Sequence, residues 1–446
     1  MAREKWNSKL GFILAASGSA VGLGNLWKFP YETYSNGGSA FIFVYLLATI
    51  LVGLPIMMAE IFIGKSTNKN PIGAFKTLHP SAWHIIGWLG IASGFVILSY
   101  YSVVGGWTLR YFLQTLTGAY LSMNQEQVAS DFGSFVQDGM AQILFHTVFM
   151  FMIVGIVILG VRKGIELAGK ILMPMLFIIL LILVVMAIQT SGFYQSILYL
   201  FYPDFSKITT NSIIESMGQS FFSLSLGMGA IITYGSYMQK NEPIIKDAIT
   251  IVFFDTMVAI MACLMIFPIL FTFELKPNAS IGILFSTLPL LFLKMPGGIV
   301  IGPLFFLLVI FAALTSGVSL LEVVVSYFID EKGWNRKKAT IVIGMAIWIL
   351  GFPSALSNGG WSWLSGMKWI GERNFFDSLD YLASSWMLPI GGIFIAIFTG
   401  WIVSKEIRNE SFAKDHDGFY NVIVFLLKYV SPLLVFLVLL NVTGIL

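Results

Sequence analysis

The sequence has little charge and almost no cysteine. Only 11% of its 446 residues are Asp, Glu, Lys or Arg, against about 25% in an average soluble protein. Cys263 is the single cysteine, which excludes an intrachain disulfide. The 4 histidines are scattered, without the spacing of a metal site. These shortages exclude a soluble globular class and a disulfide-stabilised fold.

Enzyme signatures are missing as well. The run Gly64-Lys65-Ser66 resembles the end of a phosphate-binding loop, but Ala59 stands where its first glycine belongs. The sequence contains no G-x-S-x-G nucleophile elbow. The basic N-terminus precedes an apolar run without a small-residue cleavage site, so we expect no signal peptide. We therefore predict that the protein is not an enzyme.

Long apolar runs are abundant. The chain is 57% hydrophobic, with a mean hydropathy of +0.84, and runs of about 20 apolar residues recur, as in a polytopic helical membrane protein. We predict an all-α fold with eleven spans, near 10–35, 40–64, 84–120, 141–160, 166–189, 212–238, 244–272, 297–329, 338–354, 374–403 and 419–443. The segment 278–295 is too short and proline-broken to span, and we expect a re-entrant or lid-like loop there.

The positive charges predict the orientation of these spans. With the N-terminus inside, most of the 26 lysines and arginines fall in cytoplasmic loops. An odd number of spans then puts the C-terminus outside. We expect a multi-pass protein of the cell membrane with a cytoplasmic N-terminus.

Glycines interrupt two of the expected spans. Gly18, Gly22 and Gly24 break the first, and Gly227 and Gly229 break the sixth. Each glycine costs a helix about 1 kcal/mol relative to alanine. One interpretation is a glycine-lined contact between helices. The other is a pair of broken helices, five spans apart, which indicates inverted repeats around a binding site at the membrane midplane.

Few ionisable residues lie within the spans, and each needs a partner there. They are Lys28, Glu32, Glu60, Arg110, Asp255 and Glu322. We expect Arg110 to extend toward an interface and Glu60 to accept hydrogen bonds from unwound backbone. Asp255 lies in the middle of a span, and a buried carboxylate there requires a cation.

Two adjacent hydroxyls, Thr315 and Ser316, lie in the eighth span. They can bond to carbonyls one turn earlier, as membrane hydroxyls commonly do. Together with the carbonyl of Ala312 they can also form an oxygen cage for a hard cation. The motif alone leaves both possibilities open.

Several motifs together resemble the neurotransmitter:sodium symporter family, whose members have the leucine-transporter fold. The motifs are GSAVGLGNLWKFP, NGGSAF, SYYSVVGGW, GQSFFSLSLGMGAIITYGSY and AALTSGVSL. The likeness runs from Trp6 to about Pro432, and it includes the spacing from Gly164 to Pro174. The pattern is most similar to bacterial members with eleven helices that carry hydrophobic and aromatic amino acids.

The resemblance implies one transmembrane domain over residues 1–446, built as a 5+5 inverted repeat with helices 1 and 6 broken. The first repeat covers about 10–189, the second about 212–403, and an extra helix about 419–443.

The resemblance also implies a substrate site and two sodium sites. The implied substrate residues are Ala20, Leu23, Gly24, Ile97, Tyr101, Phe222, Ser223, Ser225, Met228, Ser316 and Leu320. One sodium site comprises Ala20, Asn25, Ser223 and Asp255 with the substrate carboxylate, and the other comprises Gly18, Val21, Ala312, Thr315 and Ser316. Both sets are all-oxygen, which suits a hard cation.

Gates are implied on both sides of the substrate. Phe222 closes over it. Lys28 and Asp380 form the outer ion pair, where many relatives have arginine, and lysine lacks the bidentate geometry. Arg3 and Asp330 form the inner pair, supported by Tyr237.

The chain departs from the family pattern at two acidic positions. Asp255 replaces a common asparagine, and Glu322 replaces a glutamine of the leucine transporter; we assign no role to Glu322. Tyr45, Gln219 and Ser223 match positions that hold chloride in chloride-dependent relatives, but Ala259 replaces the last serine. Because Asp255 supplies a fixed negative charge there, we expect no chloride.

The sequence thus predicts sodium-coupled symport of hydrophobic L-amino acids into the cell. The alternative is a membrane amino-acid receptor or sensor that uses the same site without transport. The expected partners are the small-molecule substrate and the lipid bilayer, with no nucleic acid.

Overall fold

The computed structural model describes residues 3–202, 204–274, 283–294, 297–412 and 417–443, and in this part it is almost entirely helical. Nine continuous helices of the described part are long and apolar enough to cross a membrane. They are Ser39–Thr67 (α3, η2, α4), His84–Leu116 (α6), Gly139–Val157 (α8), Val161–Ile188 (η4, α9), Ile244–Thr272 (α13), Gly298–Asp330 (α15), Arg336–Leu356 (α16), Phe375–Ile402 (α18, η7, α19, η8) and Phe419–Val442 (most of α21, with η9 and α22).

Two further spans are broken. The first consists of α1 (Lys9–Ala20), followed by η1 (Gly24–Lys28) and α2 (Phe29–Ser35), with a bend of 53° at the break. The other consists of α11 (Thr210–Ser223) and α12 (Ala230–Gly235). With the nine continuous helices, the first pair gives ten candidate spans in the described part of the chain, and the predicted span 212–238 corresponds to the shorter α11 and α12.

Short helices connect the spans at both ends of the bundle. They are α5 (Pro71–Leu78), η3 (Ala119–Ser122), α7 (Gln125–Gln137), α10 (Phe193–Phe201), η5 (Phe205–Lys207), η6 (Ile283–Thr287), α14 (Leu288–Lys294), α17 (Ser362–Gly366) and α20 (Lys405–Phe412). The loop expected at 278–295 is helical over the described residues 283–294, and the rest of it lies outside the described residues.

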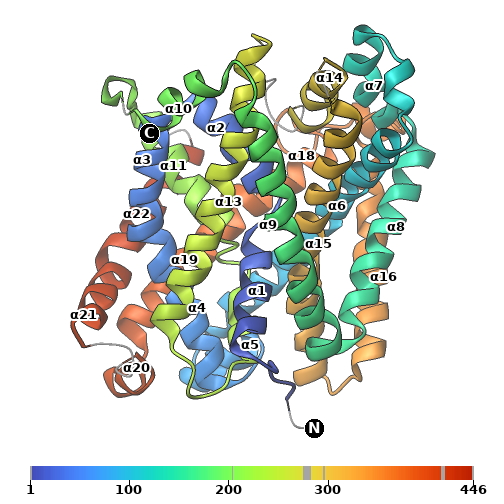
Figure 1. The fold of residues 1–446 in the computed structure, drawn as a ribbon. Helices are drawn as coiled ribbons and strands as arrows, with labels where there is room; N and C mark the ends of the chain where they lie inside the picture. The colour runs from blue at the N-terminus through green and yellow to red at the C-terminus, as the bar shows by residue number, and fades with distance from the viewer. Residues whose placement is uncertain (1–2, 203, 275–282, 295–296, 413–416, 444–446) are drawn as a thin grey trace.

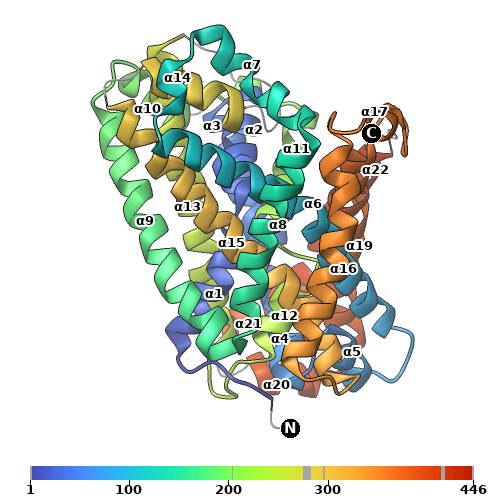
Figure 2. The ribbon, with the colours of Figure 1, turned by 90° about the vertical axis from the view of Figure 1, so that its right-hand side faces the viewer.

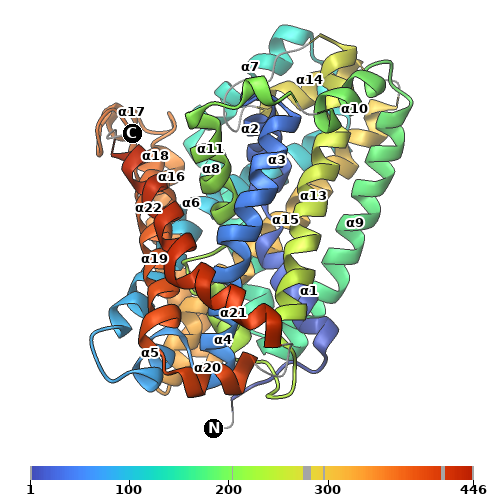
Figure 3. The same ribbon diagram turned by 90° about the vertical axis from the view of Figure 1, so that its left-hand side faces the viewer.

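The two ends of the bundle are distinct. The N-terminus lies at one end with α5 and α20, which we call the N-terminal face (Figures 1 and 3). The chain finishes toward the other end, where α7, α10 and α14 lie; we call this end the opposite face (Figure 2). Termini at opposite ends agree with an odd number of spans.

The interior of the bundle contains the broken helices and the two longest helices. α6 and α15 have 33 residues each, more than a bilayer needs, and they pack along one another. α8 and α9 lie outside them and expose large apolar side chains, such as Phe151 and Ile178. An apolar exterior around a more polar interior is the arrangement expected of a protein in lipid.

Candidate functional site

The first span breaks in the middle of the bundle. α1 ends at Ala20, Val21 is extended with ψ 101°, and the chain resumes at Gly24 as a π-helical turn. The last carbonyls of a helix have no partner within it. The break therefore presents backbone oxygens inside the protein, where they need another partner.

The second break lies between Ser223 and Ala230. Ser225, Gly227 and Gly229 all have positive φ, at 54°, 82° and 75°. The buried Glu60 accepts a hydrogen bond of 2.7 Å from the Gly227 amide. This contact confirms that Glu60 binds unwound backbone.

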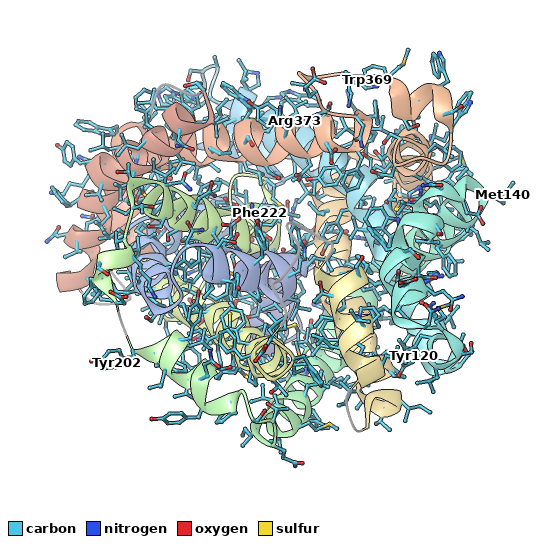
Figure 4. All side chains as sticks on the ribbon, turned by 90° about the horizontal axis from the view of Figure 1, so that it is seen from above. Tyr120, Met140, Tyr202, Phe222, Trp369 and Arg373 are labelled. Atoms are coloured by element: carbon cyan, nitrogen blue, oxygen red, sulfur yellow. The ribbon has the colours of Figure 1, made fainter. Side chains whose placement is uncertain are left out.

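A cavity of about 290 Å³ lies between the two breaks. Every residue that the resemblance implied for the substrate lines it, from α1 to α15: Ala20, Leu23, Gly24, Ile97, Tyr101, Phe222, Ser223, Ser225, Met228, Ser316 and Leu320. The lining continues toward the opposite face through Trp107, Phe132 and Phe376. Figure 4, viewed from that face, shows Phe222 in the interior and Tyr202 at the periphery.

Tyr101 and Phe222 both line the cavity. The Tyr101 hydroxyl is buried and has no hydrogen-bond partner in the described part of the chain. A buried hydroxyl without a partner is costly, so this donor is available for a ligand acceptor. The Phe222 ring packs against Gly24, where an added Cβ would come within 2.9 Å of Phe222 Cε1.

The first implied sodium site is a buried polar cluster. Asn25 Nδ2 donates to Ser223 Oγ at 3.0 Å and to Asp255 Oδ1 at 2.8 Å. Ser223 Oγ donates to Asp255 Oδ2 at 2.8 Å. The fourth residue, Ala20, lines the same cavity. Asn25 Oδ1 accepts from the Gly22 amide at 3.1 Å, which leaves one lone pair of this oxygen for another partner.

In the second implied site, the Ser316 hydroxyl lies near three carbonyl oxygens that could each accept its single proton. The Ser316 hydroxyl lies 3.3 Å from the Gly18 carbonyl, 3.2 Å from that of Ser19 and 3.4 Å from that of Val21. Because a hydroxyl has one proton, it can satisfy only one of these acceptors. The Thr315 hydroxyl lies beside them and bonds to the Ala312 carbonyl at 3.1 Å. This cluster brings together the five implied residues and fits a hard cation.

Two residues of the implied chloride position, Ser223 and Tyr45, contact the Asp255 carboxylate. Ser223 donates to its carboxylate, and the Tyr45 hydroxyl lies 3.4 Å from Asp255 Oδ2. Gln219 is buried, and its amide has no hydrogen-bond partner among the described residues. The carboxylate thus uses two donors that a bound anion would need.

The implied inner gate is closed. Arg3 forms an ion pair with Asp330, donates to Ser236 Oγ at 2.7 Å, and lies 4.8 Å from the centre of the Tyr237 ring. Burial lowers the pKa of the Arg3 guanidinium. Trp6 is buried beside it and donates from Nε1 to the Tyr234 carbonyl at 2.9 Å. The N-terminal segment is therefore held against the N-terminal face by an ion pair, hydrogen bonds and ring contacts.

The structure gives Glu322 a role that the sequence left unassigned. This buried carboxylate accepts from the Tyr237 hydroxyl at 2.6 Å and from both terminal nitrogens of Arg336, at 2.7 and 3.0 Å. The bidentate pair neutralises a charge that would otherwise be costly. Arg336 follows 14 residues later, beyond a turn, and no motif connects it to Glu322.

The implied outer pair is not formed. Lys28 Nζ lies 4.6 Å from the centre of the Phe222 ring, and no salt bridge in the described part of the chain joins it to Asp380. Asp380 instead accepts from Tyr100 at 3.0 Å and from Ser384 at 2.9 Å. The cavity thus extends toward the opposite face, whereas the Arg3–Asp330 ion pair is formed at the N-terminal face.

Two other polar contacts were not predicted from the sequence. Ser19 Oγ donates to Ser319 Oγ at 2.7 Å and joins α1 to α15 beside the cavity. Ser319 follows Ser316 by three residues, so helical spacing could have placed it on the same face. Arg110 does not simply extend toward an interface, because it pairs with Asp131.

Comparison with known proteins identifies the chain's family. It matches the family described as "Sodium:neurotransmitter symporter family" over residues 3–131 and 119–444. The chain belongs to that family. It is 38% identical to the uncharacterized sodium-dependent transporter YhdH of Bacillus subtilis, over 99% of this chain and 98% of that one.

Two other comparisons bear on this symporter-family chain. A crystal structure of MhsT in complex with L-phenylalanine matches 99% of this chain and 100% of that one, with a TM-score of 0.90 and 40% identity. The mouse sodium-dependent neutral amino acid transporter B(0)AT2 is 29% identical over 60% of this chain and 41% of its own length. The transporter therefore has the leucine-transporter fold, is not an enzyme, and is sodium-dependent.

Proposed function

We propose that the transporter carries hydrophobic L-amino acids, including aromatic ones, into the cell together with two sodium ions and without chloride. The observation that supports this most is the cavity between the two helix breaks. It combines an unpaired Tyr101 hydroxyl with an apolar wall that includes Ile97, Met228 and Leu320. The relative MhsT was solved with L-phenylalanine, which is consistent with such a substrate.

Each end of the substrate has a matching part of the cavity. The carboxylate would accept from Tyr101 and from the backbone near Leu23 and Gly24. The ammonium group would donate to the carbonyls of Ala20, Phe222 and Ser225. Apolar walls fit an apolar side chain, and the unbranched Met228 can adapt to more than one shape.

Sodium would link substrate binding to transport. One ion would be held by Asp255, Asn25, Ser223 and Ala20, and the substrate carboxylate would complete its ligand set. The other would occupy the oxygen cluster around Ser316. Two sodium ions and a zwitterion carry a net charge of +2, so a potential of 100 mV supplies about 4.6 kcal/mol. That energy can support a substrate concentration ratio across the membrane on the order of a thousandfold.

Transport would proceed by alternating access. We place the N-terminal face in the cytoplasm and the opposite face outside the cell membrane, in accord with the distribution of lysine and arginine. The conformation described here would then admit substrate from outside. We further propose that residues 10–189 and 212–403 are inverted repeats that move against each other around the breaks.

Uptake into proteoliposomes tests the proposal. With an inward sodium gradient and a negative interior, labelled phenylalanine should accumulate, and an excess of leucine or tryptophan should compete with it. Glutamate or lysine competing better than both would overturn the assigned specificity. Binding without uptake would favour the alternative, an amino-acid sensor.

A further inference from the structure

A short helix outside the membrane contributes to the cavity wall. α7 lies on the opposite face, and its N-terminus is capped by Asn124, whose side chain accepts from the Gln127 amide at 2.8 Å. Phe132 and Val136 line the cavity, and both belong to α7. They are four residues apart and therefore share one face of the helix. One side of α7 is thus part of the path between the opposite face and the substrate site.

Phe132 is held in this wall by aromatic contacts. Its ring stacks on Phe285 of η6, with centroids 5.2 Å apart and an angle of 16° between the planes. It also meets the edge of Trp107 of α6 at 5.2 Å. Trp107 in turn stacks on Phe376 of α18 at 5.8 Å. The three cavity-lining rings of Phe132, Trp107 and Phe376 come from separate elements, so the wall depends on how α7 is docked.

A largely buried ion pair docks α7 on α6. Arg110 binds the carboxylate of Asp131 with both terminal nitrogens, and its Nη2–Oδ1 distance is 2.8 Å. The Tyr111 hydroxyl donates to the same carboxylate at 2.9 Å. The guanidinium lies 4.7 Å from the Tyr111 ring centre and 5.0 Å from that of Phe135. A bidentate pair that packs against two rings fixes orientation as well as distance.

We propose that α7 is the outer wall of the substrate path, that Phe132 restricts entry to the cavity, and that the Arg110–Asp131 pair positions it. Asp131 immediately precedes Phe132, so the pair acts directly beside the ring. Loss of the pair frees α7 from α6 and opens the cavity to solvent at this side. This proposal rests on the proposed function, in which the cavity is part of the substrate path. It is tested by measuring how fast a reagent reaches the cavity, an assay that does not require transport.

Thiol labelling tests the inference. Val104 lines the cavity from α6 and is not among the implied substrate residues. A Val104→Cys protein in detergent with sodium is treated with a positively charged methanethiosulfonate, and the labelling rate is measured. Adding Asp131→Asn should raise the rate several-fold, and Arg110→Lys should raise it less. The parent protein, which retains the buried Cys263, gives the background rate.

Two further variants make the outcome decisive. Asp204→Asn breaks an exposed ion pair with Lys207 on the same face, away from the cavity lining, and should leave the rate unchanged. Phe132→Ala keeps the Arg110–Asp131 pair and removes the ring, so it should also raise the rate. If Asp131→Asn does not fold, Phe132→Ala alone decides. Rates equal to that of Asp204→Asn in the folded variants would overturn the proposal, whatever the result of uptake assays.

Discussion

Ser316 directs a single hydroxyl proton toward three backbone carbonyls. The Ser19 carbonyl also accepts from Ser225 Oγ at 2.8 Å, so the Gly18 and Val21 carbonyls compete for the Ser316 proton, and we expect a sodium ion to bind them. We expect the double change Thr315→Ala and Ser316→Val to weaken sodium activation of phenylalanine binding at least tenfold, about 1.4 kcal/mol. Equilibrium binding at graded sodium concentrations measures this.

A serine on the same helix provides the control for that change. Ser326 donates to the Val323 carbonyl at 2.8 Å and does not line the cavity. Ser326→Ala should keep the sodium dependence of the parent protein. Equal sodium dependence in the double variant and in this control would remove the second ion from the proposed mechanism.

Asp255 lies where three donors converge, and its charge decides whether an anion can also be present. We expect uptake by the unmodified transporter to be the same in chloride and in gluconate. Asp255→Asn removes the charge, so sodium binding should weaken or uptake should become chloride-dependent, because an added anion can replace the missing charge. Chloride-dependent uptake by the unmodified protein would contradict the argument.

At the scale of single residues, separation along the chain did not decide which contacts could be predicted, since the predicted Glu60–Gly227 contact joins residues 167 apart and the unpredicted Arg336–Glu322 pair joins residues 14 apart. The contact of Glu60 with unwound backbone was predicted, because a carboxylate inside an apolar span needs a polar partner and unwound backbone supplies free amide donors. The Arg110–Asp131 and Arg336–Glu322 pairs were not predicted, because each joins elements whose relative positions only the fold defines. The Lys28–Asp380 pair stays a prediction for another conformation of the same chain.

At the scale of elements, the break between α11 and α12 contains one position, Gly227, where a side chain would be strained and would also clash. Gly227 has φ 82°, and a Cβ added there would come within 2.3 Å of the Leu388 carbonyl oxygen. A left-handed conformation costs other residues about 1–2 kcal/mol, and the clash adds to this. We expect Gly227→Ala to lower the apparent melting temperature by several degrees in a ligand-stabilised thermal assay.

Gly218 provides a matched control in the same interrupted span. It lies within α11, and a Cβ there would make an ordinary contact at 3.8 Å with Val438. Gly218→Ala should be neutral or slightly stabilising, because alanine favours a helix by about 1 kcal/mol. Equal losses of stability in the two variants would contradict this account of the break.

The spans were predictable because a bilayer allows few alternatives for an apolar run. The predicted 244–272 coincides with α13, and the other continuous spans differ from their predictions by a few residues. The short helices α5, α7 and α20 were not predicted. These helices are too short to be recognised as membrane spans from hydropathy. Packing against neighbouring helices stabilises them, and the local sequence does not show that packing.

At the scale of the whole molecule, the Arg3–Asp330 ion pair is formed at the N-terminal face, whereas no salt bridge in the described part of the chain joins Lys28 to Asp380. Arg3→Ala removes the ion pair with Asp330 and should populate conformations that open at the N-terminal face. Apparent phenylalanine affinity in the presence of sodium should fall several-fold, since a competent state populated only in part weakens binding.

The control for this change keeps the gate intact. Lys338 lies near the start of α16 on the same face, its Nζ is 4.6 Å from the Trp334 ring centre, and no salt bridge in the described part of the chain involves it. Lys338→Ala should bind phenylalanine like the parent protein. If Arg3→Ala also binds with unchanged affinity, the ion pair does not bias the conformation.

The inner gate also constrains how the protein is made. Arg3 is synthesised at the start of the chain, but Asp330 follows 327 residues later. The first helices are therefore in the membrane long before the residue that seals them has left the ribosome. Contacts between distant parts of a chain form late in folding. We expect the permeability barrier at the N-terminal face to be completed near the end of biogenesis, and a nascent chain that stops before α15 to be inserted but unsealed.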